Sequence, residues 1–415
     1  MSTAAETTDL PVETSPSAAR PAPRHLGWLL AVAVAVAALN LRPVVTSLGP
    51  LLKPVQADLH MSGTVAGLLA AVPSLCFALF GLAAPALSRR FGPVVVVTAG
   101  MGAIALGVLA RSFSGGTAVF LLLTAVALAG VAVSNVLIPV VIKRYFPDRV
   151  GPMIGLYSMA LSVGTAAAAA ATVPLTEALG GSWREGLGSW GLLAVAGLLI
   201  WLVTAFLRRD RSGGAEAPAA TTKLPILRSR TAWALAVFLG LQATSAYATM
   251  GFLPSIYQDA GVSDGSSGVL LALVMAVSVP ASFILPNLAV RRGEQGVFVV
   301  VLALCGIVGY TGLAFAAGTV SWLWACLVGL SMCAFPLALT MIGLRARTPG
   351  GVAQLSAFAQ SIGYLISIPG PLLVGTIHEV TGQWYLPLGF LALLLIPQMA
   401  VGLRAGRARH IEDEA

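Results

Sequence analysis

The sequence predicts an all-α membrane protein with twelve transmembrane helices, arranged as two pseudo-symmetric halves of six helices each. Composition, the lengths of the apolar segments and an internal repeat support this prediction. Of the 415 residues, 57% are hydrophobic and only 10% are charged, whereas about 25% of residues are charged in a typical soluble domain. The mean hydropathy is +0.90. The composition therefore excludes an ordinary soluble protein.

Each predicted span is long enough to cross a hydrocarbon layer roughly 30 Å thick, which takes about 20 helical residues. The spans are residues 27–52, 62–87, 93–111, 116–142, 151–176, 186–207, 231–257, 266–290, 296–317, 319–344, 350–377 and 384–404. They divide the chain into a disordered cytoplasmic tail (1–25), an N-terminal six-helix bundle (26–207), a cytoplasmic linker (208–230), a C-terminal six-helix bundle (231–405) and a short cytoplasmic tail (406–415).

An internal repeat relates the two bundles at an offset of about 202 residues. The matched pairs are Arg89 and Arg291, Arg90 and Arg292, Lys143 and Arg345, Pro147 and Pro349, Glu177 and Glu379, Gly180 and Gly382, and Trp183 and Trp384. Two parallel six-helix halves describe the architecture of major facilitator transporters, in which the solute site lies near the membrane midplane between the halves. The repeat therefore predicts a transport site at the junction of the halves.

The distribution of positive charge predicts the orientation in the membrane. If both termini are cytoplasmic, 20 of the 24 Lys and Arg residues lie in inner segments, and the outer loops hold only Lys53, Arg111 and Arg184. This is the bias that the positive-inside rule requires. We therefore expect a multi-pass protein of the plasma (inner) membrane. The net charge of +8 is explained by topology, and no nucleic-acid partner is expected.

The stretch Asn40-Leu41-Arg42-Pro43 interrupts the first span with a charge. At 1.5 Å per residue, Arg42 is roughly 24 Å from Leu26 and roughly 15 Å from Leu52, deep in the hydrocarbon layer. No acidic residue lies inside any predicted span. Intramembrane arginines mark solute pathways by default, and the alternative is a structural role in which Arg42 donates to carbonyls of a neighbouring helix. Pro43 has no N–H for the carbonyl of Leu39, so we also expect a kink here.

Other polar residues of the spans are candidates for the same central pocket. The predicted substrate-binding set is Arg42, Asn40, Asn135, Tyr157, Ser162, Gln242, Tyr247, Gln360 and Tyr364. Gln360 and Tyr364 are one helical turn apart, so an amide and a phenol face the same side. Offset by 202 residues, Arg42 corresponds to Thr244, and the pocket is therefore expected to carry its charge on one half only. The alternative for any single polar residue is a hydrogen bond between packed helices.

Three segments resemble the cyanate and 2-nitroimidazole permease branch of the major facilitator superfamily. They are Asn40-Leu-Arg-Pro43 with Gly49-Pro50, Gly240-Leu-Gln-Ala-Thr-Ser-Ala-Tyr247 with Leu253-Pro254, and Ala359-Gln-Ser-Ile-Gly-Tyr364 with Gly370-Pro-Leu-Leu. The likeness covers nearly all of residues 26–405. It implies a secondary transporter of a small polar or anionic solute. The superfamily's loop motif is degenerate, because Arg89 stands where an aspartate is usual.

Several other functions are weighed against this one. A multidrug or metabolite exporter of the same superfamily is the nearest alternative, although exporters of cationic drugs commonly need a membrane-embedded carboxylate. The sequence has no His-Glu-x-x-His pair and no Gly-Lys-Ser/Thr phosphate loop, which argues against a membrane enzyme or an ATP-driven pump. Its four scattered cysteines and four histidines predict no metal, and no cofactor is expected. We expect a monomer whose partners are the solute and the bilayer. Flux should respond weakly to proton gradients unless Glu177, Glu379 or the solute carries the proton.

Overall fold

The computed structural model describes residues 24–208 and 225–414, and these are helical with no β-strand. The tail 1–23 and most of the predicted linker lie outside the described residues. In the N-terminal half the helices are α1 (Arg24–Leu41), α2 (Pro43–Thr46), η1 (Gly49–Leu51), α3 (Leu52–Asp58), α4 (Gly63–Phe91), α5 (Pro93–Ser112), α6 (Thr117–Tyr145), η2 (Pro147–Arg149), α7 (Val150–Ala178) and α8 (Trp183–Arg208).

The C-terminal half contains η4 (Ile226–Arg228), α9 (Arg230–Asp259), α10 (Asp264–Val290), α11 (Gly296–Ala316), α12 (Ser321–Ser331), α13 (Ala334–Leu344), α14 (Pro349–Ser367), α15 (Pro369–Thr381), α16 (Tyr385–Ala405) and η5 (Ile411–Asp413). Within the described ranges, eleven helical segments are long and apolar enough to cross a membrane, and α10 contributes a further apolar helix at Asp264–Pro280. This agrees with the predicted all-α membrane fold.

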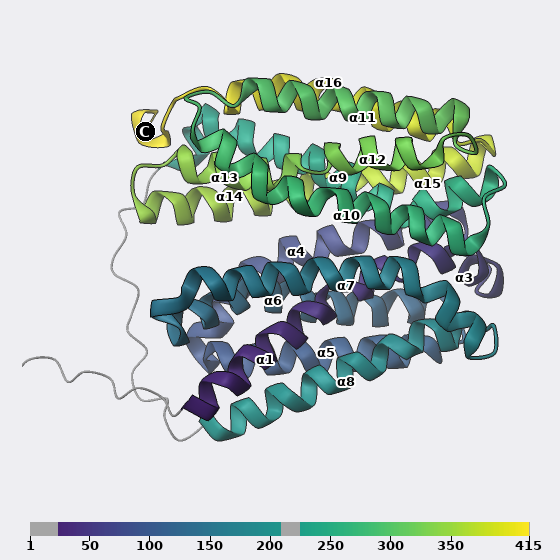
Figure 1. The fold of residues 1–415 in the computed structure, drawn as a ribbon, viewed down its shortest axis with the longest axis horizontal. Helices are drawn as coiled ribbons and strands as arrows, with labels where there is room; N and C mark the ends of the chain where they lie inside the picture. The colour runs from purple at the N-terminus through teal and green to yellow at the C-terminus, as the bar shows by residue number, and fades with distance from the viewer. Residues whose placement is uncertain (1–23, 209–224, 415) are drawn as a thin grey trace, which may run out of the picture.

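The two halves lie side by side as separate groups of roughly parallel helices (Figure 1). One end of the molecule carries Arg89, Arg144, Arg345 and Arg404, and we call it the arginine-rich end. Lys53, Asp58 and Arg184 lie at the opposite, arginine-poor end. The side chains of many large apolar residues point outward from α5, α8, α11 and α16, among them Leu106, Leu192, Phe315 and Leu393. Exposed apolar area of this kind is expected where helices face lipid.

The internal repeat is visible in hydrogen bonding at the arginine-poor end. Trp183 Nε1 donates to Asp58 Oδ2 at 3.2 Å, and Trp384 Nε1 donates to Asp259 Oδ2 at 2.6 Å. The second pair repeats the first at an offset of 201 residues. Each bond ties the start of the last helix of a half to the end of its first transmembrane segment, at Asp58 of α3 and at Asp259 of α9. The same local structure therefore closes both bundles.

Small residues allow the halves to pack closely near the arginine-poor end. A Cβ atom at Gly67 of α4 would lie 2.7 Å from the carbonyl oxygen of Pro371 at the start of α15, and one at Gly63 would lie 2.8 Å from that of Gly375. Gly63 and Gly67 are one turn apart, the spacing that permits close helix contact in membranes. Backbone-to-backbone packing thus holds the two halves together at this end.

Candidate functional site

The first transmembrane segment breaks at Arg42, as predicted from the proline that follows it. Helix α1 ends at Leu41, and Pro43 begins α2. The Arg42 carbonyl accepts the N–H groups of Val45 and Thr46 at 3.1 and 3.0 Å, which starts the new helix. Gly164 of α7 approaches the Leu39 carbonyl so closely that a Cβ atom there would lie 2.4 Å from the oxygen. A helix break and a close helix contact therefore lie side by side at this depth.

The Arg42 side chain is partly exposed and unpaired. Among the described residues, no hydrogen bond or ion pair is found for its guanidinium, and the cations of the ion pairs are Lys53, Arg184, Arg347 and His410. Burying a cation without a partner costs free energy. Arg42 is therefore an uncompensated charge that an anionic or strongly polar ligand would stabilise.

Three tyrosines lie within electrostatic range of this charge. The Arg42 guanidinium interacts electrostatically with the phenols of Tyr157 on α7, Tyr247 on α9 and Tyr364 on α14. Arg42 and Tyr157 belong to the N-terminal half, whereas Tyr247 and Tyr364 belong to the C-terminal half. Four of the predicted site residues are thus brought together, and they come from both halves.

Neighbouring contacts orient two of the tyrosines. Tyr157 donates its hydroxyl proton to Asn135 Oδ1 at 2.6 Å, which also brings the predicted residue Asn135 to the cluster. The ring of Tyr364 stacks on Phe77 of α4, with centroids 5.1 Å apart and an angle of 25° between the planes. Because Phe77 and Tyr364 lie on different halves, this stack must change when the halves move apart.

Two predicted residues have their amides engaged within their own halves. Asn40 is buried and donates to the carbonyls of Val36 and Leu193, at 2.8 and 3.1 Å. Gln242 donates to the Met332 carbonyl at 3.4 Å. In a regular helix the N–H of residue 336 would donate to that carbonyl, but residue 336 is a proline and has no N–H. Both amides therefore donate to backbone carbonyls, and the Met332 carbonyl lies at the break between α12 and α13.

Gln360 and Ser162 are partly exposed and bonded locally. Gln360 Nε2 donates to Ser356 Oγ at 2.7 Å, one turn earlier on α14, and Ser162 donates to the Ser158 carbonyl at 3.0 Å. Gln360 and Tyr364 share one helix, as expected. Direct solute contact by Asn40, Ser162, Gln242 and Gln360 stays a prediction.

Arg111 is a second intramembrane cation, and the sequence reasoning missed it by assigning it to an outer loop. The structure places it in the last turn of α5, fully buried. Its Nη1 donates to the Val44 carbonyl at 3.1 Å. That carbonyl is open because the Leu48 N–H bonds to Val45 instead, at 3.2 Å, in a 3₁₀ turn. Arg111 thus donates to the irregular backbone that begins at Arg42. The signal available in the sequence for its burial was its position at the end of an apolar run.

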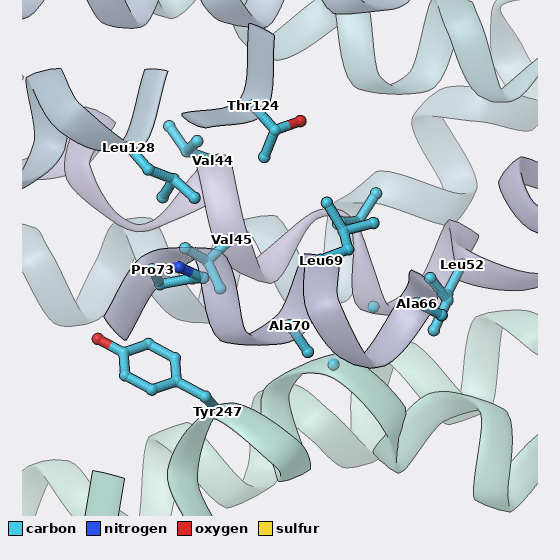
Figure 2. Close-up of a pocket in the computed structure, with 13 residues that line it drawn as sticks. Val44, Val45, Leu52, Ala66, Leu69, Ala70, Pro73, Thr124, Leu128 and Tyr247 are labelled. Atoms are coloured by element: carbon cyan, nitrogen blue, oxygen red, sulfur yellow. The ribbon is translucent and has the colours of Figure 1, made fainter. Parts of the chain in front are cut away.

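A small cavity lies between the halves, on the arginine-poor side of Arg42. Figure 2 shows Val44, Val45, Leu69 and Thr124 of the N-terminal half around it, together with Tyr247 of the C-terminal half. Its volume is about 20 Å³, enough for roughly one water molecule. Apolar side chains therefore nearly fill the space between Arg42 and the arginine-poor end.

Polar contacts join the halves further toward the arginine-poor end. Lys53 Nζ forms an ion pair with Asp259 Oδ1 at 2.6 Å. Glu379 Oε2 accepts the N–H of Thr64 at 2.6 Å and its hydroxyl at 2.7 Å. With the glycine packing of α4 against α15, these contacts close the molecule at this end.

Comparison with known proteins finds transporters among the relatives of this chain. The chain is 36% identical over 389 residues to the uncharacterized transporter YycB of Bacillus subtilis, covering 92% of this chain and 94% of that protein. It is 34% identical to the 2-nitroimidazole transporter of Escherichia coli, with 92% and 96% covered. It is also 30% identical to the cyanate transport protein CynX of Escherichia coli, with 89% and 95% covered.

A solved structure with the same fold is that of a bacterial homologue of the human lysosomal transporter Spinster, in an inward-facing and occupied conformation. It superposes with a TM-score of 0.73 at 16% identity, covering 92% of this chain and 97% of the other. The model of the Major Facilitator Superfamily matches residues 29–371. The relatives are transporters rather than enzymes. This chain therefore belongs to the major facilitator superfamily.

Proposed function

We propose that this protein is a secondary active transporter of a small polar or anionic solute, of the cyanate-like or nitroimidazole-like class, across the plasma membrane. The observation that carries the proposal is the unpaired Arg42 guanidinium among Tyr157, Tyr247 and Tyr364, at the junction of the halves. Relatives at 34% and 30% identity are named for 2-nitroimidazole and cyanate.

The chemistry of the cluster suits such solutes. A guanidinium offers a planar, bidentate set of donors that fits two adjacent acceptor oxygens, as in a nitro or carboxylate group. It also neutralises a small anion such as cyanate. The phenols of Tyr247 and Tyr364 supply donors whose position is set by rigid rings, and Tyr157, which donates to Asn135, offers an acceptor oxygen. The aromatic faces of Tyr364 and Phe77 offer a surface on which a planar azole can stack.

Alternating access would work through the contacts that join the halves. The arginine-poor end is closed by the Lys53–Asp259 ion pair and by Glu379 on Thr64. We take the arginine-rich end as cytoplasmic, from the positive-inside rule. Rocking of the halves would break these contacts and open Arg42 to the outside. A solute bound to both Arg42 and the C-terminal tyrosines would stabilise the closed intermediate between the two open states.

A ligand screen tests the proposal directly. Purified protein would be heated with small anions, azoles and organic cations, and the unfolding temperature recorded. A ligand that binds only the folded protein raises this temperature by mass action. We expect stabilisation by small anions or nitroazoles. Stabilisation by organic cations alone would refute the assignment and favour an exporter of cationic compounds.

A further inference from the structure

A large basic cavity lies at the arginine-rich end of the C-terminal half, away from Arg42. Its volume is about 640 Å³. It is lined by Arg228 at the end of η4 and Arg230 at the start of α9, and by Arg404, Arg407 and Arg409 at the end of α16 and in the chain that follows. Residues from opposite ends of this half of the chain thus place five guanidinium groups around one space.

The charge in this cavity is poorly compensated. Glu414 is the acidic residue among its lining side chains, and its carboxylate is already bound. It accepts hydrogen bonds from Ser229 Oγ, Thr231 N and Thr231 Oγ1, at 2.7, 3.0 and 2.8 Å. In the described part of the chain, none of the five arginines forms an ion pair with a carboxylate. The cavity therefore keeps a strong positive potential.

The lining changes from basic to apolar along the helices. Ala234 and Val237 of α9 and Val401 of α16 line the cavity further from the helix ends. The indole of Trp233 also lines it, is 41% exposed, and donates to the Leu227 carbonyl at 3.0 Å. Tryptophan with one polar contact is typical of the level of lipid head groups. The cavity thus runs from the head-group region toward the acyl-chain region.

We propose that this cavity binds an anionic phospholipid, with the arginines on its phosphodiester and an acyl chain along Val237 and Val401. Arginine clusters at the cytoplasmic surface bind anionic lipid head groups, and the guanidinium fork fits phosphate oxygens. The apolar part of the lining favours a lipid over a free phosphate ion. The positive-inside rule accounts for arginines in cytoplasmic loops, but it does not require that five of them share one cavity with an apolar floor.

The test uses the full-length protein purified in detergent. Native mass spectrometry would count bound phosphatidylglycerol during titration, with phosphatidylcholine and inorganic phosphate as the other probes. The variant combines Arg404→Gln, Arg407→Gln and Arg409→Gln. A matched control combines Arg89→Gln, Arg90→Gln and Arg144→Gln, which removes the same charge from the same end of the other half. Thermal unfolding of both variants checks that they are folded.

We expect wild-type protein and the control to bind phosphatidylglycerol in preference to phosphatidylcholine. Each arginine near the membrane surface contributes roughly a fivefold gain in affinity, so the triple variant should bind roughly a hundredfold more weakly. An equal loss in both variants would mean that only net charge matters, and would overturn the site. Inorganic phosphate that displaces phosphatidylglycerol at equal concentration would overturn the assignment to lipid. Equal binding of the two lipids by wild-type protein would do the same.

Discussion

Arg42→Gln removes the charge at the proposed transport site and keeps a polar side chain of moderate length. A hydrogen bond to a charged group contributes about 1.5–3 kcal/mol. Two such bonds to a solute, at the lower end because Arg42 is partly exposed, give about 3 kcal/mol. At 1.4 kcal/mol per factor of ten, the loss in kcat/KM is roughly a hundredfold.

The same substitution should leave the fold intact. Arg42 has no carboxylate partner among the described residues. Replacing it with Gln therefore leaves no buried carboxylate unpaired, and the usual free-energy cost of breaking a buried ion pair does not arise. We expect an unfolding temperature equal to or above that of the wild type. Arg42→Lys keeps the charge but loses the planar pair of donors, and we expect it to be defective in transport as well.

Solute flux in proteoliposomes, at matched amounts of inserted protein, measures these effects. Cyanate and 2-nitroimidazole are the solutes to use, each over a range of concentrations that yields KM. Wild-type kinetics in Arg42→Gln or Arg42→Ala vesicles would refute the reasoning. A strongly lowered unfolding temperature in Arg42→Gln would also refute it, because it would mean that Arg42 is bonded to the protein.

Three further substitutions test closure of the arginine-poor end, the stability of the fold, and the contact of the C-terminal tail with the start of α9. Gly67→Val places a side chain against the Pro371 carbonyl, whose oxygen would lie 2.7 Å from the Cβ atom. The substitution should disfavour closure of the arginine-poor end by about 1–3 kcal/mol. Labelling of an introduced cysteine from outside should then rise, and unchanged labelling would contradict the packing argument. Arg345→Gln removes two bonds of 2.9 Å to backbone carbonyls and a third to Gln295 Oε1. The free energy of unfolding should therefore fall by at least about 3 kcal/mol, while flux per folded molecule stays unchanged. Burial opposes ionisation of Glu414, but hydrogen bonds from the start of α9 hold its pKa below the ordinary value of 4.5. The contact between Glu414 and the start of α9 is therefore fully present above that value and is lost as pH falls through the lowered pKa. Protection of the tail amides from hydrogen exchange, expressed relative to the intrinsic rate at each pH, should fall at low pH to that of Glu414→Gln at neutral pH. Protection that stays at its neutral-pH value would contradict the argument.

Much of the fold follows from sequence because a membrane leaves few choices. Backbone groups must be bonded within each span, so apolar segments of sufficient length become helices. The break at Arg42 was predictable for a local reason, the missing N–H of Pro43. The break between α14 and α15, before Pro369, has the same cause. The first span was predicted to end at residue 52, whereas helical structure continues through α3 to Asp58, because a polar helix at the membrane surface carries no hydropathy signal.

The site was harder to predict, because the direction of a side chain depends on helix rotation. Polar type alone did not separate Tyr157, Tyr247 and Tyr364, which lie within electrostatic range of Arg42, from Asn40 and Gln242, whose amides donate to backbone carbonyls. For Gln242 the available signal was Pro336, which has no N–H to donate to the Met332 carbonyl that the Gln242 amide contacts. Arg111 was missed because it was assigned to an outer loop, and because the sequence does not show that a 3₁₀ turn at Leu48 leaves the Val44 carbonyl open as its acceptor.

A structure of the protein with a transported anion or nitroazole bound tests the central claim most directly. We predict density for the solute between the halves, within hydrogen-bonding distance of the Arg42 guanidinium and in contact with Tyr157, Tyr247 or Tyr364. Solute bound elsewhere, with Arg42 turned to lipid or bonded to main-chain carbonyls, would contradict the account.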